Sequence, residues 1–411
     1  MILSGGGTAG HVYPALALAD RLKSQGHEVL FVGTPDTVQL TRNGYHRTGE
    51  ASFERRLARK HGIDFEAIDV LPLDSDYTIW RGKDRAYYPS LYLAPRSWRK
   101  ARKPARDIIK RFDPDVVVGF GGYVCAPIVS AAGQAEVPVI LHEQNSIMGK
   151  ANKRLSRHAC ALALTYEDTG NLAPLKTQQC SKVTGNPVRP SMHALSRGDA
   201  RARLGIDDDE VFVLVFGGSK GARRLNDVVI EALPQVLEND QVRILHATGA
   251  VDFKRVCALR EEHCKRPSRD ITEDTRPDEH EKEKRYRLVP YIDDMDQVMP
   301  AADLVVARAG STSIAEIIAL GIPSILIPFP YAAADHQRTN AQPIADAGAA
   351  VVIPEKRGEP IDGKLFTDTL DSLIRDQTRR LQMREAAGIF GPPDALSALI
   401  SLLEEKACRV R

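Results

Sequence analysis

The chain has 411 residues, of which 43% are hydrophobic and 27% charged, and its formal net charge is +2. This length predicts two domains, because one hydrophobic core rarely organises so long a chain. The balanced charge argues against a dedicated nucleic-acid-binding protein. The six cysteines are scattered without zinc or disulfide spacing, so we expect a reducing compartment and no metal site. No apolar run approaches the roughly 20 residues that span a bilayer, and the start of the chain lacks a signal-peptide pattern. Any membrane contact is therefore expected to be peripheral.

The chain opens with the pattern of a strand, a glycine-rich loop, a helix and a second strand, which together predict a βαβ unit. The glycines satisfy G-x-G-x-x-G, but the second strand ends in Gly33 and Thr34 rather than in an acidic residue. The sequence therefore disfavours an NAD or FAD site. His11 follows the loop at the predicted helix start, where a histidine suits acid–base chemistry, although a lone histidine is more often structural.

Residues 35–65 are polar and predict a loop with one short helix. Residues 77–111 differ, because aromatic residues including both tryptophans lead into a strongly basic helix. This combination favours an anionic membrane surface, to which each Lys or Arg contributes about 1 kcal/mol. The alternative is a solvated helix whose apolar side packs on its own domain.

Two buried strands are predicted at 115–120 and 137–141, and the second ends in four polar residues, His142 to Asn145. Polar side chains are costly at the end of an apolar strand unless they are hydrogen-bonded. We therefore expect them to be bonded at the ligand-binding edge of a sheet. The prolines and glycine of 184–190 predict a domain boundary, with Arg189 in the hinge.

The second half repeats the pattern of the first. A buried strand at 211–216 precedes a glycine-rich turn and a helix, so the sequence predicts two Rossmann-like domains facing each other across a cleft. The turn lacks Walker A spacing. Residues 260–287 are highly charged and predict a surface helix with a mobile insertion.

Residues 303–340 predict a strand, a small-residue turn, a helix, a second strand and a polar loop. Both turns fall at carboxyl ends of parallel strands, where open α/β sheets bind ligands. The helix after Gly310 suits a phosphate or pyrophosphate. We infer a nucleoside-diphosphate pocket that Glu316 and Gln337 can reach. Alternatively, Ser313 and Glu316 form a capping box, in which Glu316 bonds only the start of its own helix.

Several blocks together resemble the MurG family of glycosyltransferases, glycosyltransferase family 28. They occur in the family's order across nearly the whole chain, which makes the resemblance more specific than any single loop. The blocks are Gly5-Gly6-Gly7-Thr8-Ala9-Gly10-His11, His142-Glu143-Gln144-Asn145, Gly185-Asn186-Pro187-Val188-Arg189, Gly217-Gly218-Ser219-Lys220-Gly221-Ala222, Tyr291-Ile292-Asp293-Asp294-Met295, Arg308-Ala309-Gly310-Ser311-Thr312-Ser313-Ile314-Ala315-Glu316 and Asp335-His336-Gln337.

The resemblance implies an α/β protein of the GT-B fold. Its first domain, 1–185, would face the acceptor and the membrane, and its second, 186–411, would bind UDP-GlcNAc, with a last helix able to cross back to the first domain. The implied activity is inverting transfer of N-acetylglucosamine from UDP-GlcNAc to the 4-hydroxyl of the MurNAc unit of undecaprenyl-pyrophosphoryl-MurNAc-pentapeptide (lipid I), which gives lipid II for peptidoglycan. No cofactor, metal or nucleic acid is implied. The expected location is peripheral, on the cytoplasmic face of the plasma membrane, through segment 77–111.

The resemblance also implies residue roles. His11 would contact the acceptor hydroxyl as the general base, and Glu143 is the second candidate for that role. The remaining implied contacts all serve UDP-GlcNAc: Thr8, Ala9, Gly10, Asn145 and Arg189 beside the donor, Ser219 at the diphosphate, Ile292 at the uracil, Ser311, Thr312, Ser313, Ile314, Ala315 and Glu316 at the phosphate and ribose, and Gln337 at the sugar.

The sequence departs from the family pattern at Ala9, where the family has glycine, and in the insertions near 36–58 and 262–285. Two other readings stay open. One is a related GT-B lipid glycosyltransferase or a UDP-sugar epimerase, which would need more cleft carboxylates than Glu143 and Glu316. The other is a non-catalytic UDP-sugar-binding protein.

Overall fold

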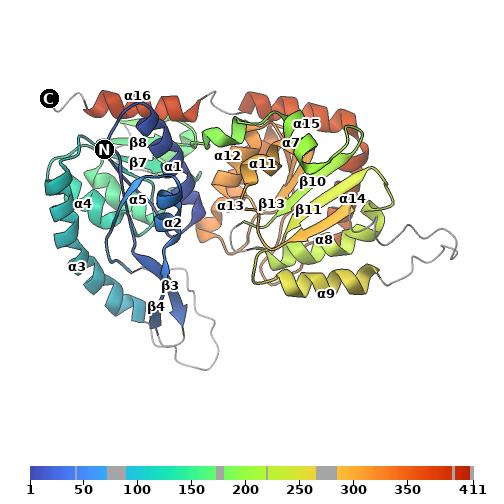
Figure 1. Cartoon of the computed structure of the whole chain (residues 1–411), viewed down its shortest axis with the longest axis horizontal. Helices are drawn as coiled ribbons and strands as arrows, with labels where there is room; N and C mark the ends of the chain where they lie inside the picture. Colours follow the sequence, from blue (N-terminus) through green and yellow to red (C-terminus); the bar gives the residue numbers. More distant parts are fainter. Residues whose placement is uncertain are drawn as a thin grey trace. The chain divides into compact units, whose positions relative to one another are not determined.

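The computed structural model describes residues 1–41, 44–71, 89–172, 180–218, 221–264, 285–390 and 394–407. The chain forms two compact units (Figure 1). Unit 1 comprises Met1–Arg189 and Pro392–Arg411, and unit 2 comprises Pro190–Gly391.

Unit 1 is built on a seven-stranded parallel sheet of order β5-β2-β1-β6-β7-β8-β9. Its inner strands are buried throughout, as expected for a parallel sheet covered on both faces. The strand order reverses beside β1, so the ligand crevice of such a sheet lies at the carboxyl ends of β1 and β6. The strands are β1 (Ile2–Ser4), β2 (Leu30–Gly33), β5 (Asp64–Ala67), β6 (Val117–Gly119), β7 (Val139–Glu143), β8 (Ala161–Leu164) and β9 (Ser181–Val183).

The helices of unit 1 include one from the far end of the chain. The helix α16 contacts α1 and β8 (Figure 1). Its Leu399 and Leu403 are fully buried in one cluster with Leu16 and Leu18, because their i, i+4 spacing places them on one helix face. The helical segments are α1 (Ala9–Ser24), α2 (Phe53–Lys60), α3 (Pro89–Phe112), α4 (Ala126–Gln134), α5 (Lys150–Leu155), η1 (Ser156–His158), η2 (Glu167–Leu172) and α16 (Ala395–Ala407).

One expectation for unit 1 is wrong in part. Residues 35–65 contain the expected short helix, α2, but also an antiparallel hairpin of β3 (Asp36–Thr41) and β4 (Gly44–Ala51). The β-branched and apolar residues that alternate with polar ones from Thr37 to Thr41 favour a strand, even though the segment as a whole is polar.

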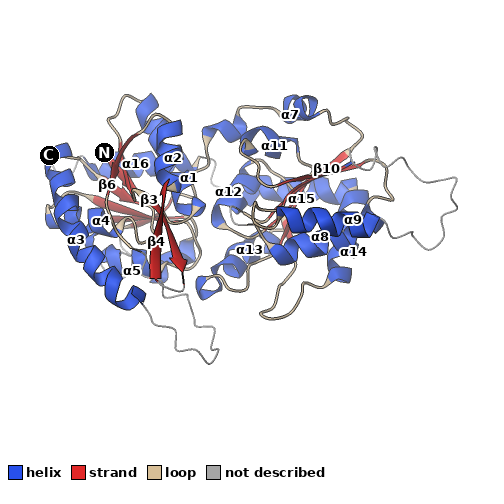
Figure 2. Cartoon of the chain, turned by 60° about the horizontal axis from the view of Figure 1, so that its bottom comes forward, coloured by secondary structure: helices blue, strands red, loops and turns tan. Residues whose placement is uncertain are grey.

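Unit 2 repeats this architecture with a six-stranded parallel sheet of order β12-β11-β10-β13-β14-β15. Helices flank each sheet (Figure 2). The order reverses between β10 and β13, which places the second ligand edge at their carboxyl ends. The strands are β10 (Val211–Phe216), β11 (Val242–Ala247), β12 (Tyr286–Val289), β13 (Leu304–Ala307), β14 (Ser324–Leu326) and β15 (Ala350–Val352).

The helical segments of unit 2 are η3 (Pro190–His193), α7 (Arg197–Leu204), α8 (Arg223–Val236), α9 (Phe253–Cys264), α11 (Met295–Val298), η5 (Met299–Ala301), α12 (Ser311–Ala319), η6 (Ala333–Asp335), α13 (His336–Asp346), α14 (Gly363–Arg375) and α15 (Gln377–Phe390). No helix of the described residues is long and apolar enough to cross a membrane. The two sheets confirm the predicted α/β class with two Rossmann-like domains.

Candidate functional site

His11 lies in the first turn of α1, directly after the glycine loop that follows β1. Its Nδ1 is 3.0 Å from the carbonyl oxygen of Gly6 and 3.0 Å from Oγ1 of Thr8. A carbonyl oxygen only accepts hydrogen bonds, so Nδ1 carries a proton and donates it. In the neutral ring the lone pair is therefore on Nε2, the atom that a general base would use. Ala9 and Gly10 begin the same helix, so the predicted loop residues are adjacent to His11 in space.

Two glycines after β6 lie against the imidazole of His11, and neither was among the predicted site residues. A Cβ added at Gly121 would lie 3.3 Å from Nε2 of His11, and one added at Gly122 would lie 2.5 Å from the carbonyl oxygen of Gly6. Both glycines have positive φ angles, +92° and +78°. They allow the loop after β6 to pack closely against His11 and Gly6 at the switch point of the sheet. The glycine pair after an apolar strand is the sequence signal that could have identified them.

Glu143, at the end of β7, is 3% exposed and accepts four hydrogen bonds. Its Oε1 accepts from the backbone and side-chain nitrogens of Asn145, both at 3.1 Å. Its Oε2 accepts from the backbone nitrogen of Gly149 at 3.0 Å and from Nδ2 of Asn152 at 2.8 Å. The carboxylate thus fixes the loop that carries Asn145 and joins it to α5. The second of these partners, Asn152, belongs to no motif that could be recognised in the sequence.

The other polar residues at the end of β7 are also bonded, as predicted. Gln144 donates from Nε2 to the carbonyl oxygen of Phe120 at 2.8 Å. His142 is fully buried, with Nε2 3.0 Å from the carbonyl oxygen of Gly185. Burial lowers the pKa of His142 to about 4, so the ring is neutral near pH 7. In the predicted hinge, the Arg189 guanidinium lies 4.4 Å from the ring centre of Tyr13 in α1. The hinge is therefore anchored to both sides of the carboxyl edge of unit 1.

In unit 2, the helix α12 begins directly after β13, with Gly310 as its N-cap and no side-chain cap hydrogen bond from the described residues. The capping-box alternative is wrong, because the helix begins at Ser311 and Ser313 lies inside its first turn. Glu316 is buried one turn further along. The first-turn amides of this helix point to the carboxyl edge of the sheet, where the helix dipole favours an anion.

The donor contacts predicted for unit 2 lie in α12, in α13 and in the loops of this edge. Gln337 lies in the first turn of α13, and its Oε1 accepts from the backbone nitrogen of Phe329 at 2.9 Å. Ile292 is partly buried in the loop that follows β12. Ser219 lies outside the described residues.

A buried ion pair lies behind the β13 turn, formed by residues far apart in the chain. Arg308 is bonded to Glu355 at 2.6 Å, and Arg224 is bonded to the same carboxylate at 3.1 Å. Nη1 of Arg308 also donates to the carbonyl oxygen of Ile327 at 3.2 Å. These contacts join the loops after β13, β14 and β15. Glu355 has no local motif that could have identified it from sequence.

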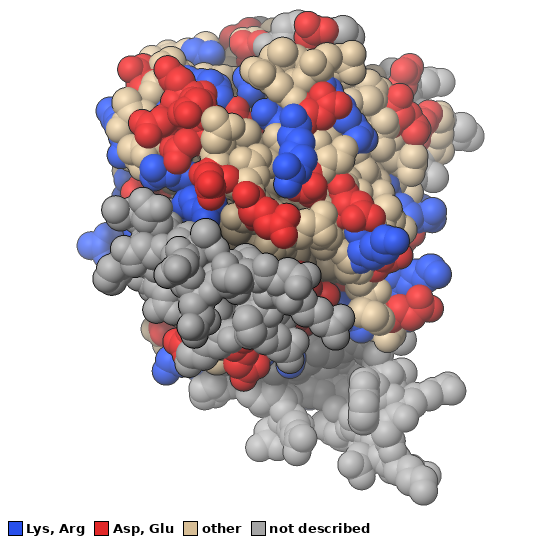
Figure 3. Space-filling view, turned by 90° about the vertical axis from the view of Figure 1, so that its right-hand side faces the viewer, with Lys and Arg blue, Asp and Glu red and all other residues tan. Residues whose placement is uncertain are grey.

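The described residues contain no group of three or more His, Cys, Asp or Glu side chains placed to hold a metal ion. On the face of the molecule in Figure 3, acidic and basic side chains are interspersed. No broad patch of one sign covers the described part of that face.

Comparison with known proteins connects both halves to one family. Models of the glycosyltransferase family 28 amino-terminal and carboxy-terminal domains match residues 1–163 and 212–398. A relative from Halothermothrix orenii is 34% identical over 407 residues, or 99% of each chain. One from Lactiplantibacillus plantarum is 36% identical over 406 residues, or 98% of each chain. Both are named UDP-N-acetylglucosamine--N-acetylmuramyl-(pentapeptide) pyrophosphoryl-undecaprenol N-acetylglucosamine transferase.

Solved structures agree with this assignment. Acinetobacter baumannii MurG is 27% identical with a TM-score of 0.66, and the match covers 98% of this chain and 99% of that one. A putative UDP-N-acetylglucosamine 2-epimerase from Listeria monocytogenes has a TM-score of 0.64 at 12% identity, over 98% of this chain and 95% of that one, which is a likeness of fold alone. The two domain models and the full-length relatives show that this chain belongs to glycosyltransferase family 28, with the two Rossmann-like domains of the GT-B fold.

Proposed function

We propose that the protein transfers N-acetylglucosamine from UDP-GlcNAc to the 4-hydroxyl of the MurNAc unit of lipid I, with inversion at the sugar, to give lipid II. The observation that carries the proposal is similarity over the full length of relatives named for this transfer. Two features support it: unit 1 holds a base candidate, and unit 2 holds a helix amino terminus that suits an anion.

His11 is the proposed general base. Its Nδ1 is held by Gly6 and Thr8, so Nε2 takes the proton from the acceptor hydroxyl as the oxygen attacks the anomeric carbon of the donor sugar. The bond between that carbon and the phosphate oxygen breaks, and UDP leaves with the electron pair. Attack on the side opposite the departing phosphate inverts the configuration.

Unit 2 is the proposed donor domain. The first turn of α12, Ser311 to Ser313, would bind the diphosphate, and Glu316 the ribose. Gln337 would donate from its amide nitrogen to the sugar, since its oxygen is already bonded to Phe329. In this proposal the amino terminus of α12, rather than a bound metal, stabilises the departing UDP.

Glu143 is proposed as a positioning residue rather than the base. The carboxylate already accepts four hydrogen bonds from the protein, so its lone pairs are occupied. Taking a proton from the acceptor would break some of these bonds. Its proposed effect on transfer is to hold Asn145 beside the donor.

A transfer assay tests the proposal, using radiolabelled UDP-GlcNAc with lipid I as acceptor. We expect labelled lipid II from the wild type, and a loss in kcat of roughly 100- to 10,000-fold for His11→Ala, the range typical of a missing general base. Glu316→Ala should weaken UDP binding while leaving the melting temperature near that of the wild type. UDP binding without transfer would support the non-catalytic alternative, and release of an epimerised UDP-sugar would support the epimerase alternative.

We further propose that unit 1 attaches to the cytoplasmic face of the plasma membrane through the 77–111 segment. Part of it, residues 77–88, lies outside the described residues. Within α3, Ala101, Ala105, Ile108 and Ile109 are buried in the core of unit 1. The opposite side exposes Arg96, Arg99, Lys100, Arg102, Lys103, Arg106, Lys110 and Arg111.

Sedimentation with vesicles tests the attachment. Replacing Lys100, Lys103 and Arg106 by Gln should weaken binding to phosphatidylglycerol vesicles by about 3 kcal/mol, at about 1 kcal/mol per charge. The matched control removes the same charge from α2 of the same unit by replacing Arg55, Arg59 and Lys60, which are also exposed. If both triple variants lost the same vesicle affinity, net charge alone would explain the binding, and a specific α3 surface would be contradicted.

A further inference from the structure

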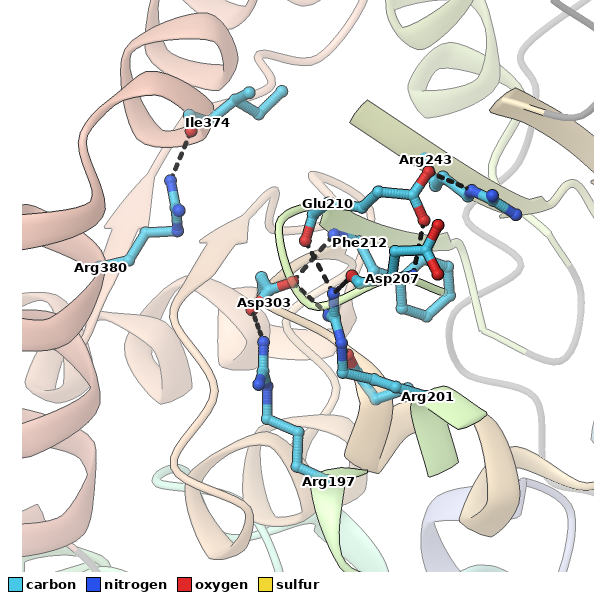
Figure 4. A network of polar contacts seen from close by, with 10 residues as sticks. Arg197, Arg201, Asp207, Glu210, Phe212, Arg243, Asp303, Ile374 and Arg380 are labelled. Atoms are coloured by element: carbon cyan, nitrogen blue, oxygen red, sulfur yellow. Dashed lines mark hydrogen bonds and ion pairs between the residues drawn. The ribbon is translucent and has the colours of Figure 1, made fainter. Parts of the chain in front are cut away.

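A group of arginines surrounds a single carboxylate at the amino-terminal edge of the unit 2 sheet. Asp303 directly precedes β13, Arg197 and Arg201 lie on α7, and Arg380 and Arg384 lie one turn apart on α15. Figure 4 shows Arg197 and Arg201 reaching Asp303, with Arg380 on the neighbouring helix. This edge is opposite the carboxyl edge that holds the proposed donor site.

Arg201 and Asp303 neutralise each other. The Arg201 side chain is 1% exposed and is 2.8 Å from Oδ2 of Asp303. Oδ2 also accepts from the backbone nitrogen of Phe212 at 2.9 Å, and the Arg201 guanidinium donates to the carbonyl oxygen of Glu210 at 2.8 Å. A buried pair with further hydrogen bonds is a structural anchor, here fixing α7 to the start of β10 and β13.

Nearby carboxylates balance the charges of the other arginines only in part. Arg197, 40% exposed, shares the carboxylate that Arg201 already neutralises. Arg380 donates to the carbonyl oxygens of Leu373 and Ile374 at the end of α14. The charges of Asp303 and Asp376 also act on it, but it forms no ion pair with a carboxylate of the described residues. Arg384 makes no hydrogen bond or ion pair with any residue in the described ranges, although it is partly buried.

The surroundings of Arg384 disfavour its charge. Burial lowers the pKa of both Arg380 and Arg384. The charge of Arg197 acts on Arg384 in the same direction, as does that of Arg380, and Asp303 only partly opposes them. The stem of Arg384 packs against the loop after α12, where a Cβ at Gly321 would lie 3.7 Å from its Cγ. A desolvated guanidinium beside two others is costly unless an anion joins it.

We propose that Arg197, Arg380 and Arg384 bind a phosphate-type oxyanion, either free or on a lipid headgroup, at the amino-terminal edge of the unit 2 sheet. Guanidinium groups bind such oxyanions through two parallel N–H donors, and a multivalent anion balances more than one of them. The site is separate from the proposed donor site and does not depend on the proposed transfer.

Thermal unfolding with inorganic phosphate tests the site, in the presence of saturating UDP so that the donor site is occupied. Sodium chloride at equal ionic strength is the salt control. We expect phosphate to raise the melting temperature of the wild type above the chloride value. Arg384→Gln should weaken the apparent phosphate Kd about tenfold or more, as expected for one lost charge-assisted hydrogen bond. Arg379→Gln, which removes an exposed arginine from the same helix, should keep the wild-type Kd.

Two further measurements complete the test. If Arg384→Gln does not fold, Arg384→Lys replaces it in the phosphate titration, because lysine keeps the charge but lacks the two parallel N–H donors. If Arg384→Gln binds phosphatidylglycerol vesicles more weakly than the wild type, and free phosphate competes with the vesicles for the wild type, the anion is a lipid headgroup. If both proteins bind vesicles equally while phosphate still raises the melting temperature of the wild type, the anion is a free one. Equal stabilisation by phosphate and chloride, or an unchanged phosphate Kd in Arg384→Gln, would overturn the proposal.

Discussion

The contacts of Glu143 make its replacement the sharpest test of how unit 1 is held together. In Glu143→Gln the side chain keeps its shape but presents one acceptor oxygen and one NH₂ group. Four donors surround this position, so the new NH₂ would face two of them. Glu143 is 3% exposed, so solvent cannot compensate. We expect Glu143→Gln to destabilise unit 1 by about 3–5 kcal/mol, the range for breaking a buried charged network.

Differential scanning calorimetry measures this loss. For a domain of this size, about 4 kcal/mol corresponds to a melting temperature lower by roughly 10 °C. Glu167→Gln is the control, because Glu167 is an exposed acid of the same unit, and its change should stay within about 0.5 kcal/mol. If Glu143→Gln instead melted with the wild type and lost only turnover, Glu143 would be the base and the positioning role would be refuted.

Two more predictions follow from local geometry. Gly122→Ala should abolish most transfer, since the new Cβ would lie 2.5 Å from the Gly6 oxygen that holds the base candidate. Gly26→Ala is the control and should retain kcat, because Gly26 has a similar φ of +85° but a Cβ there would meet nothing within 4 Å. Stability should fall from pH 7 to pH 5, because burial lowers the pKa of His142 to about 4 and of His246 to about 3. The unfolded chain then binds protons that the folded chain excludes, at about 2 kcal/mol per histidine. Urea titrations at both pH values measure this change in the free energy of unfolding. If His142→Gln and His246→Gln lost as much stability between pH 7 and pH 5 as the wild type does, the explanation would be contradicted.

The sequence predicts what depends on local pattern. Runs such as Val211 to Phe216 are apolar throughout, and a glycine-rich turn and a helix follow, so the sheets and their ligand edges could be located. Polar residues at the end of a buried strand, as at His142, could be expected to be bonded. Local pattern also misled, because the Ser313–Glu316 spacing of a capping box recurs inside a helix that begins two residues earlier.

Contacts between distant residues could not be predicted. Arg201 and Asp303 are separated by 102 positions, and Arg224 and Glu355 by 131. No local motif joins either pair, because only the folded sheet brings their elements together. The orientation of His11 likewise depends on a backbone carbonyl, Gly6, which has no signature in residue type. The protonated nitrogen of the base candidate therefore emerged only from the structure.

The linkage in the product tests the central claim most directly. Nuclear magnetic resonance of the disaccharide formed from UDP-GlcNAc and lipid I should show a β-linked N-acetylglucosamine on the 4-hydroxyl of MurNAc, because a single displacement inverts the α-linked donor. An α-linked product, attachment at another hydroxyl, or recovery of only an epimerised UDP-sugar would contradict the account.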